Sequence, residues 1–528
     1  MKKMFTDLKL PLLLVTLMSL CAALSLPILL IDETRYVSAA WEMWNRHSFL
    51  VPYLNGEPYS HKPPLLFWMM HAGWALFGVN DITPRLIPGF FSLLCLMLVY
   101  RISLRIWPQE RKTAVYAALI LAGTMMWDVW SIAIMFDMVL AFWILLGLLG
   151  TLRAAEQQRG GWLLLTAGVA GGLLTKGPAV LVYLLSIPLL RVWWDVRREA
   201  PVRAKWYLCI LGIAALGFAI ALLWAVPAAI QGGETYRQAI LWGQTMDRVT
   251  SSFAHRRPLW WYLPIIPLLF FPWIFFRPAF SKLRLKIADT GTRFCLIWFG
   301  LPLLIFSLIS GKQVHYLIPF IPAGALLIGR NIARSESAAG KGSGKAIGIL
   351  FLLPGLVAMV FPFTKLGADI GLRESVSTWI IAAGLLVAGL PLLFPFRSTV
   401  NTARKLALSM TLLLVFALFE ANKCFLHGYD VKEVAVFIKS EMDAGHSVAH
   451  LGKYHGQYHF LGRLPQPITV LQGDKALIYD FAKRNPGALF ISYQLEQNNL
   501  PKKAEVCFTH RYRGKTSVVL WRLRTDQP

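Results

Sequence analysis

The feature that most constrains this chain is a long succession of apolar runs, each about 18–22 residues in length, separated by short polar connections. We count about thirteen such runs, because about 20 apolar residues form a helix that crosses the hydrocarbon core of a bilayer. They fall at 10–31, 84–106, 113–130, 133–152, 161–176, 178–194, 206–230, 258–276, 294–310, 313–332, 346–363, 377–396 and 405–424. Hydrophobic residues make up 56% of the chain, too many for a water-soluble protein to cover with polar surface. The sequence therefore predicts a polytopic α-helical membrane protein.

The charge of the chain is strongly basic, with 53 Lys and Arg against 28 Asp and Glu and a formal net charge of +25. Such a balance often indicates a nucleic-acid partner, but here the basic residues lie in short clusters between apolar runs. The clusters occupy alternate connections, which is the pattern that orients membrane proteins with their basic loops in the cytoplasm. We therefore predict no nucleic-acid partner, a cytoplasmic N-terminus, and an outer location for residues 32–83 and for the chain after about Lys423.

The outer stretch 32–83 contains two predicted interfacial helices. Val37, Ala40, Trp41 and Trp44 recur at helical spacing and form one apolar face, which suits a helix lying in the membrane interface. Asp32 stands where this helix begins, so its carboxylate is expected to cap the free amides of the first turn. Pro63 and Pro64 are suited to open a second short helix.

The last hundred or so residues have the pattern of a small α/β domain, which we place at 425–528. The segment "VKEVAVFIKSEMDAG" predicts an amphipathic helix, and "HSVAHL", "ALFISY" and "KTSVVLWRL" predict strands. The domain has no phosphate-binding glycine loop, so we predict no nucleotide site in it. Residues 1–424 then form the transmembrane domain.

Polar residues gather at the outer ends of the predicted spans, where charges are costly unless they face a protein cavity. These residues are Asp32, Glu33, Arg35, His61, Lys62, Asp128, Asp137, Lys176, Asp247, Arg248, His255, Arg256, Arg257, Lys312, His315 and Tyr316. Carboxylates and more numerous cations on one face suit an anion that stays in the lipid. A polyprenyl phosphate has that chemistry, and Lys62, Arg35 and an arginine from 248–257 would neutralise its phosphate.

Five motifs resemble the bacterial glycosyltransferases of the protein mannosyltransferase and lipid A 4-amino-4-deoxy-L-arabinose transferase type. They are "IDETRY", "YSHKPPLLFW", "LLTKGP", "HRRPLWWYLP" and "SGKQVHYLIP". The resemblance covers nearly the whole chain and implies a GT-C fold with a C-terminal α/β domain outside the membrane. It also implies an undecaprenyl-phosphate sugar donor and inverting transfer to a lipid A, glycan or protein acceptor at the periplasmic face of the inner membrane.

Carried over by position, the resemblance assigns Asp32 to the acidic outer-loop position of catalysis and Lys62 to a lysine that binds the donor phosphate. Tyr316 falls on a tyrosine that also reaches phosphate. His255 falls on a histidine that, in the relatives, can bind a metal together with a glutamate, and His61 replaces that glutamate here. A His61–His255 pair would offer two ligands for a divalent ion such as zinc or magnesium, fewer than a closed site requires.

Roles for individual residues stay open at this point. Asp32 acts as a general base if the acceptor is a hydroxyl, and orients groups if the acceptor is an ionised phosphate. Asp137 is either a second catalytic carboxylate or half of a buried ion pair, and Lys176 is expected to anchor a turn. Arg35, Arg248 and Arg256 complete the expected phosphate site, and Glu33, Lys312 and His315 line the pocket; Glu33 is otherwise the partner of Arg35. The alternative function is a transporter or flippase of a lipid-linked sugar, whose charges would lie nearer the bilayer midplane.

Overall fold

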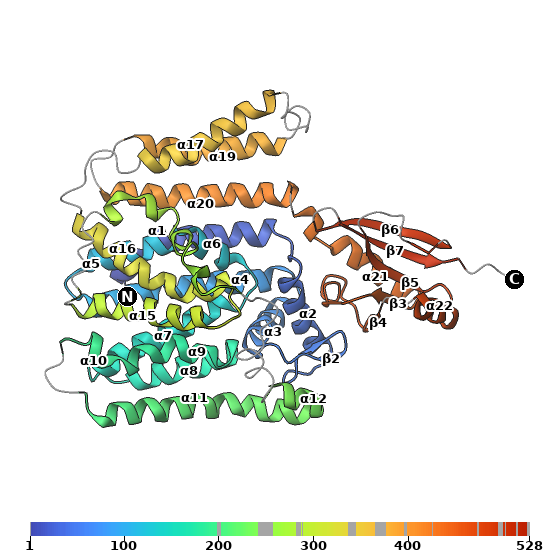
Figure 1. Cartoon of the computed structure of the whole chain (residues 1–528), viewed down its shortest axis with the longest axis horizontal. Coiled ribbons are helices and arrows are strands. Elements are labelled where there is room, and N and C mark those ends of the chain that lie inside the picture. The colour runs from blue at the N-terminus through green and yellow to red at the C-terminus, as the bar shows by residue number, and fades with distance from the viewer. Residues whose placement is uncertain are drawn as a thin grey trace.

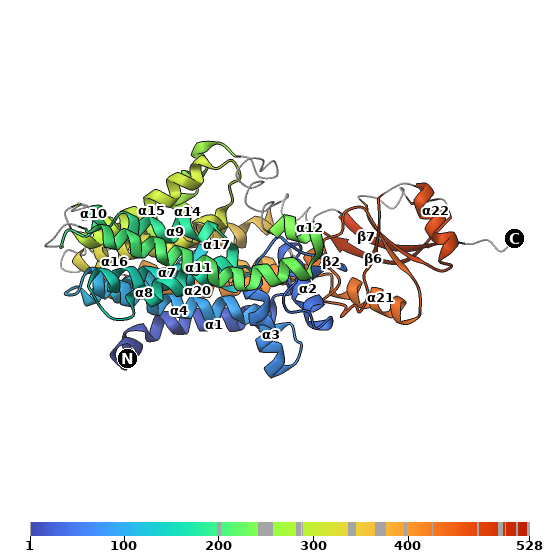
Figure 2. The same ribbon diagram turned by 90° about the horizontal axis from the view of Figure 1, so that it is seen from below.

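The computed structural model consists of a helical bundle with a small sheet domain extending from one end (Figure 1). It describes residues 2–197, 202–240, 257–280, 287, 289–335, 345–364, 376–394, 399–424, 426–472, 475–494, 500–501, 503–513 and 516–524. Two views at right angles place the N-terminus at the opposite end of the bundle from the sheet domain (Figures 1 and 2).

Seven helical segments among the described residues are long and apolar enough to cross a membrane. They are α1 (Lys2–Ser25), α4 (Ile82–Ile106), α7 (Asp137–Ala155), α11 (Ala204–Gln231), α15 (Thr290–Leu308), the segment Val314–Ser335 that ends in α16 (Ile321–Ser335), and α20 (Thr399–Cys424). Helices α5 (Arg111–Leu121) and α6 (Met125–Ile132) are apolar and meet at an angle of 61°, which is the geometry of a broken span or of a re-entrant loop. Shorter helices complete the bundle: α8 (Gly161–Lys176), α9 (Ala179–Leu189), α10 (Arg191–Trp194), α12 (Gly233–Gln238), α17 (Lys345–Val360) and α19 (Val376–Leu393). The prediction of a multi-pass membrane protein is confirmed.

Every predicted apolar run contains helical structure, but the run 258–276 is not the continuous span that we expected. It is divided into η3 (Leu259–Tyr262), α14 (Ile266–Leu269) and η4 (Trp273–Phe275), with η5 (Arg277–Ala279) following. The run contains Pro258, Pro264, Pro267 and Pro272. Proline lacks the amide proton that a helix needs and clashes with the preceding turn, so these residues break the run into single turns.

Helices α7 and α8 pack closely because glycines line their contact. A β-carbon at Gly168 of α8 would lie 2.7 Å from the backbone oxygen of Trp143, and one at Gly150 of α7 would lie 2.5 Å from the amide nitrogen of Leu165. Small residues let membrane helices approach to backbone contact. This packing brings the first residue of α7, Asp137, beside the last residue of α8, Lys176.

Two basic residues, Arg111 of α5 and Arg330 of α16, form ion pairs away from the sheet domain. Arg111 pairs with Asp7 near the N-terminus at 2.7 Å, and Arg330 pairs with Glu110 at 2.8 Å and with Asp289 at 2.7 Å. These contacts join the loop before α5 to the N-terminal end of α1, to α16 and to the start of α15.

The outer stretch forms helix α2 (Asp32–Asn45), a hairpin of β1 (Tyr53–Leu54) and β2 (Glu57–Pro58), and helix α3 (Leu65–Phe77), all beside the sheet domain (Figure 1). Helix α3 begins directly after Pro64, as expected. The capping prediction for Asp32 is wrong: Asp32 is itself the first residue of α2, Ile31 precedes it, and no side chain caps the helix.

The C-terminal domain has one five-stranded mixed sheet in the order β4-β3-β5-β7-β6 (Figure 1). Strand β3 (Val448–Leu451) runs parallel to β4 (Thr469–Leu471) and β5 (Leu489–Gln494), and β7 (Thr516–Leu523) runs antiparallel to β5 and to β6 (Ala504–Tyr512). Helices η9 (His427–Tyr429), α21 (Lys432–Asp443) and α22 (Lys475–Arg484) accompany the sheet. The predicted amphipathic helix and three strands are confirmed, whereas β4, β6 and α22 were not predicted.

Residues 452–468, which we call the docking loop, attach the sheet domain to the outer stretch. The amide of Phe460 donates to the hydroxyl of Ser38 at 3.1 Å, and the indole of Trp41 donates to the carbonyl of Leu464 at 3.2 Å. The side chain of Asn55 also donates to the carbonyl of Ile468 at 2.9 Å and accepts from the Ile468 amide at 2.8 Å. The sheet domain is therefore held by hydrogen bonds to the segment that carries Asp32.

Candidate active site

The centre of the candidate site is a buried ion pair between Asp137 and Lys176. The Lys176 ammonium lies 2.6 Å from the Asp137 carboxylate, and the side chains are 8% and 2% exposed, respectively. Two charges removed from water need such a partner, since burial of either charge alone is costly. One of the two roles expected for Asp137, half of a buried ion pair, is thus what the structure has. Its partner is Lys176, which we had expected to anchor a turn.

Further charges surround this pair. The ammonium of Lys62 lies 5.5 Å from the centre of the Phe136 ring and 5.8 Å from that of Tyr36, within the range of a cation–π contact. Both Lys62 and His315 lie near enough to Asp137 to interact with it electrostatically. The cluster therefore holds more positive than negative groups.

Aromatic rings line the same cluster. The Lys176 ammonium lies 5.3 Å from the centre of the Tyr316 ring, whose neighbour His315 packs against it edge-on at 4.8 Å. The backbone oxygen of Tyr316 accepts a hydrogen bond of 2.9 Å from the hydroxyl of Tyr183. The segment that carries the expected phosphate ligand Tyr316 is therefore fixed against α9 and next to the ion pair.

Asp32 and Arg35 form a second, more exposed ion pair on α2, and the Asp32 side chain is 53% exposed. Tyr36 lies between the two pairs, because its ring packs edge-on against Phe136 at 5.0 Å and it interacts electrostatically with both Asp32 and Asp137. Burial, reinforced by the charge of Asp32, raises the pKa of Tyr36 above its ordinary value, so its hydroxyl stays protonated. The site thus contains one exposed ion pair, Asp32–Arg35, and one buried ion pair, Asp137–Lys176.

Glu33 lies beside Asp32 in sequence but outside this cluster. Its carboxylate accepts from the Arg85 guanidinium at 2.6 Å, from the amide of Ile134 at 2.9 Å and from the amide of Leu29 at 2.8 Å. The side chains of Glu33 and Arg85 are both buried. The structure therefore brings Glu33 to α4 and to the loop before α7 rather than to the expected pocket, and Arg35 pairs with Asp32 instead of Glu33.

Two other expected residues have local partners. The Lys312 ammonium is buried and donates to the carbonyls of Ile309 at 2.5 Å and Arg257 at 3.1 Å. His61 is exposed and its ring stacks on Tyr59 with the ring centres 5.2 Å apart. Arg248, His255 and Arg256 lie outside the described residues.

The described residues do not form a metal site. Within the described ranges, no group of three or more His, Cys, Asp and Glu side chains lies together. His61 stacks on a tyrosine, and the second expected ligand, His255, is outside the described ranges. We derive no step through a metal ion.

Sequence reasoning missed two residues, Tyr36 within the site and Arg85, which pairs with Glu33 outside it. Arg85 stands near the outer start of an apolar run, and a charge in that position calls for a buried acidic partner. That rule points to Glu33 or Asp137 without choosing between them. Tyr36 carried no signal beyond its place in "IDETRY".

The fold is that of a polytopic helical membrane protein with a sheet domain at its C-terminal end. Residues 61–224 match the dolichyl-phosphate-mannose-protein mannosyltransferase family. ArnT from Cupriavidus metallidurans, solved with bound undecaprenyl phosphate, has the same fold, with a TM-score of 0.74, 19% identity, and coverage of 97% of this chain and 98% of that one. The expected GT-C fold is therefore confirmed.

More particularly, the chain is similar to the undecaprenyl phosphate-alpha-4-amino-4-deoxy-L-arabinose arabinosyl transferases. It is 31% identical to transferase 2 of Pseudomonas fluorescens over 62% of this chain and 60% of the relative. It is also 31% identical to the Erwinia tasmaniensis transferase over 56% of this chain and 54% of the relative. The matched region thus spans between about half and three fifths of these curated relatives, and the resemblance expected from the motifs is confirmed.

Proposed function

We propose that this chain is an inverting glycosyltransferase of the bacterial inner membrane. It takes a sugar from an undecaprenyl-phosphate carrier and transfers it at the periplasmic face to a lipid A, glycan or protein acceptor. The observation that carries the proposal is the presence of two cations, Lys62 and Lys176, around Asp137, with the His315 ring nearby and the open Asp32–Arg35 pair next to them. The similarity to undecaprenyl-phosphate-dependent arabinosyl transferases supports the same donor.

In the proposed reaction, the acceptor oxygen attacks the anomeric carbon from the face opposite the carrier phosphate. The bond between that carbon and the phosphate oxygen breaks, and its electron pair leaves with the polyprenyl phosphate. Lys62 and Arg35 stabilise the added negative charge, together with the hydroxyl of Tyr316 and the arginines Arg248 and Arg256. Cations suit this role because negative charge develops on the phosphate as it leaves.

Asp32 acts on the acceptor side. If the acceptor is a hydroxyl, the Asp32 carboxylate takes its proton during attack. If the acceptor is an ionised phosphate, no proton needs to move, and Asp32 orients the acceptor through Arg35. The half-exposed position of Asp32 supports both roles, because an incoming group can reach it.

Asp137 holds Lys176 in position at the buried end of the site. Its ion pair with Lys176 holds one cation beside the Tyr316 ring and compensates the surrounding positive charge when no phosphate is bound. We also propose that residues 1–424 are the catalytic membrane domain and 425–528 a periplasmic domain, with a cytoplasmic N-terminus. The alternation of basic loops and the opposite ends occupied by the N-terminus and the sheet domain support this orientation (Figure 1).

Mass spectrometry of envelope lipids and polyprenyl-linked sugars tests the proposal in cells with the gene, without it, and with Asp32→Asn. We expect one fixed sugar mass to disappear from an envelope molecule in the last two strains, while the carrier-linked sugar accumulates. Asp443→Asn is the matched control, since Asp443 is an exposed carboxylate paired with Lys439 on α21 and far from the site in sequence. Unchanged envelope lipids in the deletion strain would exclude a lipid acceptor. If the envelope glycans and proteins were unchanged as well, transfer would be refuted and the flippase alternative favoured.

A further inference from the structure

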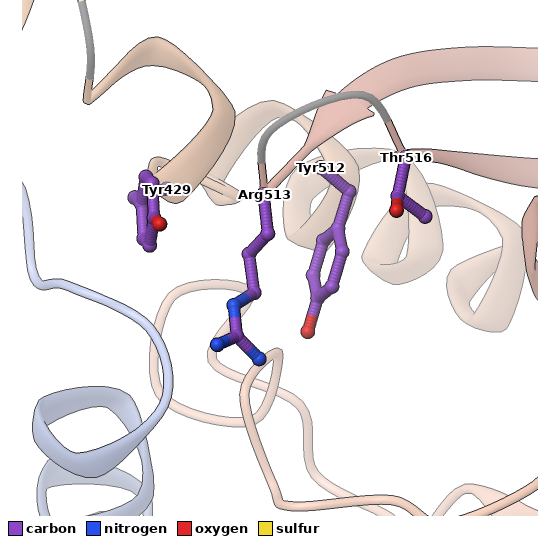
Figure 3. A pocket seen from close by; sticks show the side chains of 4 residues that line it. All are labelled: Tyr429, Tyr512, Arg513 and Thr516. Carbon is purple, nitrogen blue, oxygen red and sulfur yellow. The ribbon is translucent and has the colours of Figure 1, made fainter. Parts of the chain in front are cut away.

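The sheet domain contains a cavity that the proposed reaction has not used. It has a volume of about 390 Å³, and Tyr429, Tyr512, Arg513 and Thr516 line it (Figure 3). The lining residues come from η9 and from the two sides of the turn between β6 and β7. The Arg513 guanidinium and the Tyr512 hydroxyl point in the same direction from that turn (Figure 3). A cavity of this size accepts a small polar group such as a sugar phosphate.

Among the described residues that line the cavity, Arg513 is the charged one, and its side chain is exposed. In the described part of the chain, no carboxylate pairs with the guanidinium of Arg513, although other arginines of this domain are paired. Arg522 pairs with Glu441 and Arg484 pairs with Asp480. An arginine without an acidic partner beside two tyrosines and a threonine is suited to bind an anion, because its planar donors match phosphate or carboxylate oxygens.

The cavity lies near the proposed catalytic centre. His455 of the docking loop interacts electrostatically with Arg35 and Asp32 of α2 and also with Lys453 and Arg513 of the sheet domain. His455 therefore lies within electrostatic range of both sets of charges. The docking loop that carries His455 is also hydrogen-bonded to α2 through Phe460 and Ser38, so one loop adjoins both the helix that begins at Asp32 and the sheet domain.

The wall of the cavity is held in place by a hydrogen-bonded tyrosine cluster. The ring of Tyr512 lies 4.4 Å from that of Tyr493, whose hydroxyl bonds to the hydroxyl of Tyr458 at 2.7 Å and to Nε2 of His450 at 3.0 Å. The side-chain amide of Gln457 also donates to the Tyr493 hydroxyl at 2.7 Å. A site that is already ordered loses less entropy when it binds a ligand.

We propose that this cavity is an acceptor subsite that binds the phosphate of an anionic lipid headgroup through Arg513, with Lys453 adding positive charge. The inference rests on the proposed function, because it names the chemistry of the acceptor for that reaction. It assigns the sheet domain a role in choosing the acceptor, separate from the donor phosphate site of the membrane domain.

The test measures the binding of purified lipid A to the full-length protein in nanodiscs, using bisphosphorylated lipid A and its dephosphorylated form. We expect Arg513→Ala to weaken binding of the phosphorylated form about tenfold and to leave the dephosphorylated form unchanged, as expected for one charge-assisted contact. Arg513→Lys should recover part of the loss. Arg484→Ala, which removes an exposed arginine from α22, is the matched control and should bind like the wild type.

Steady-state transfer separates this inference from the proposed function. Arg513→Ala should raise the KM for the phosphorylated acceptor and leave the KM for the donor unchanged. Wild-type protein that transfers no sugar would refute the proposed function, whereas the binding comparison would still decide the subsite. Equal binding of phosphorylated lipid A by wild type and Arg513→Ala would overturn the subsite. Displacement of the lipid by millimolar inorganic phosphate would also overturn it, because the cavity would then take free phosphate.

Discussion

At the scale of single residues, Asp32 and Glu33 are adjacent in the chain and occupy opposite environments. The Asp32 carboxylate is 53% exposed and pairs with Arg35, while the Glu33 carboxylate is 7% exposed and pairs with Arg85. An exposed ion pair contributes about 0–1 kcal/mol to stability. Loss of one partner from a buried pair costs about 3–5 kcal/mol, because the other charge stays buried alone.

We therefore expect Asp32→Asn to lose sugar transfer with little change in melting temperature, and Glu33→Gln to lower the melting temperature strongly. Thermal unfolding of the two purified variants, measured beside their transfer rates, makes the comparison. A Glu33→Gln variant as stable as the wild type would contradict the structural role of the Glu33–Arg85 pair. Because Asp32 and Glu33 are consecutive residues at the start of α2, each variant shows how far a substitution there disturbs the helix in general.

The Asp137–Lys176 pair allows stability to be separated from activity. Asp137→Ala leaves Lys176 buried without its partner and should destabilise the protein by about 3 kcal/mol or more. The double variant Asp137→Ala/Lys176→Met removes both charges, so it should regain most of the stability while transfer stays low. Melting temperature and transfer rate are measured on the same preparations. Full transfer by the stable double variant would show that the pair is structural alone.

The sequence indicated which residues carry charge at the outer face, but not which of them meet. The Asp137 partner lies 39 residues away on another helix, and Glu33 is 52 residues from Arg85. Such pairings depend on how the helices pack, and glycine contacts such as that of Gly168 with α7 are decided in three dimensions. From the sequence alone, we therefore assigned Lys176 to a turn and Glu33 to the pocket.

At the scale of elements, the predictable parts were those with strong periodicity. The amphipathic helix α21 and the strand β7 were predicted, because one face of α21 and the centre of β7 are buried and their sequences show the matching apolar pattern. Strand β6 is at the sheet edge with most of its side chains exposed or half-buried, so its sequence lacks a regular apolar alternation. Strand β4 has three residues, which is too short for a pattern.

The docking loop gives the sheet domain a predicted pH dependence through His459. Burial, followed by the charge of Arg46, lowers the pKa of His459 from 6.5 to about 3. The unfolded chain therefore takes up the proton first, so this contribution to stability is complete above pH 6.5 and is lost as the pH falls toward 3. Hydrogen exchange of the docking loop between pH 7 and pH 4.5 should reveal increasing opening. In His459→Gln the increase should be smaller; an equal increase would exclude His459 as the cause.

At the scale of the whole molecule, the proposed orientation is tested by one native cysteine. Cys507 on β6 is exposed, whereas the other described cysteines, Cys21, Cys95, Cys209 and Cys295, lie in membrane helices and are buried or partly buried. In Cys424→Ser protein, which lacks the cysteine at the end of α20, a maleimide that does not cross membranes should label Cys507 in spheroplasts, and Cys507→Ser should abolish that label. Lys112→Cys at the start of α5, introduced into Cys424→Ser/Cys507→Ser protein, should react after lysis alone. Labelling of Cys507 only after lysis would reverse the orientation.

The hydrogen bonds between the docking loop and α2 also have a consequence for biosynthesis. Ser38 and Phe460, which form one of these bonds, are 422 residues apart in the chain. At translation rates of about 5–20 residues per second, α2 leaves the ribosome roughly 20–80 s before the loop that covers it. Throughout that interval the growing protein carries its outer helices without their partner. The contact between α2 and the docking loop is therefore formed last. A chain interrupted before residue 460 would be inserted in the membrane without this contact.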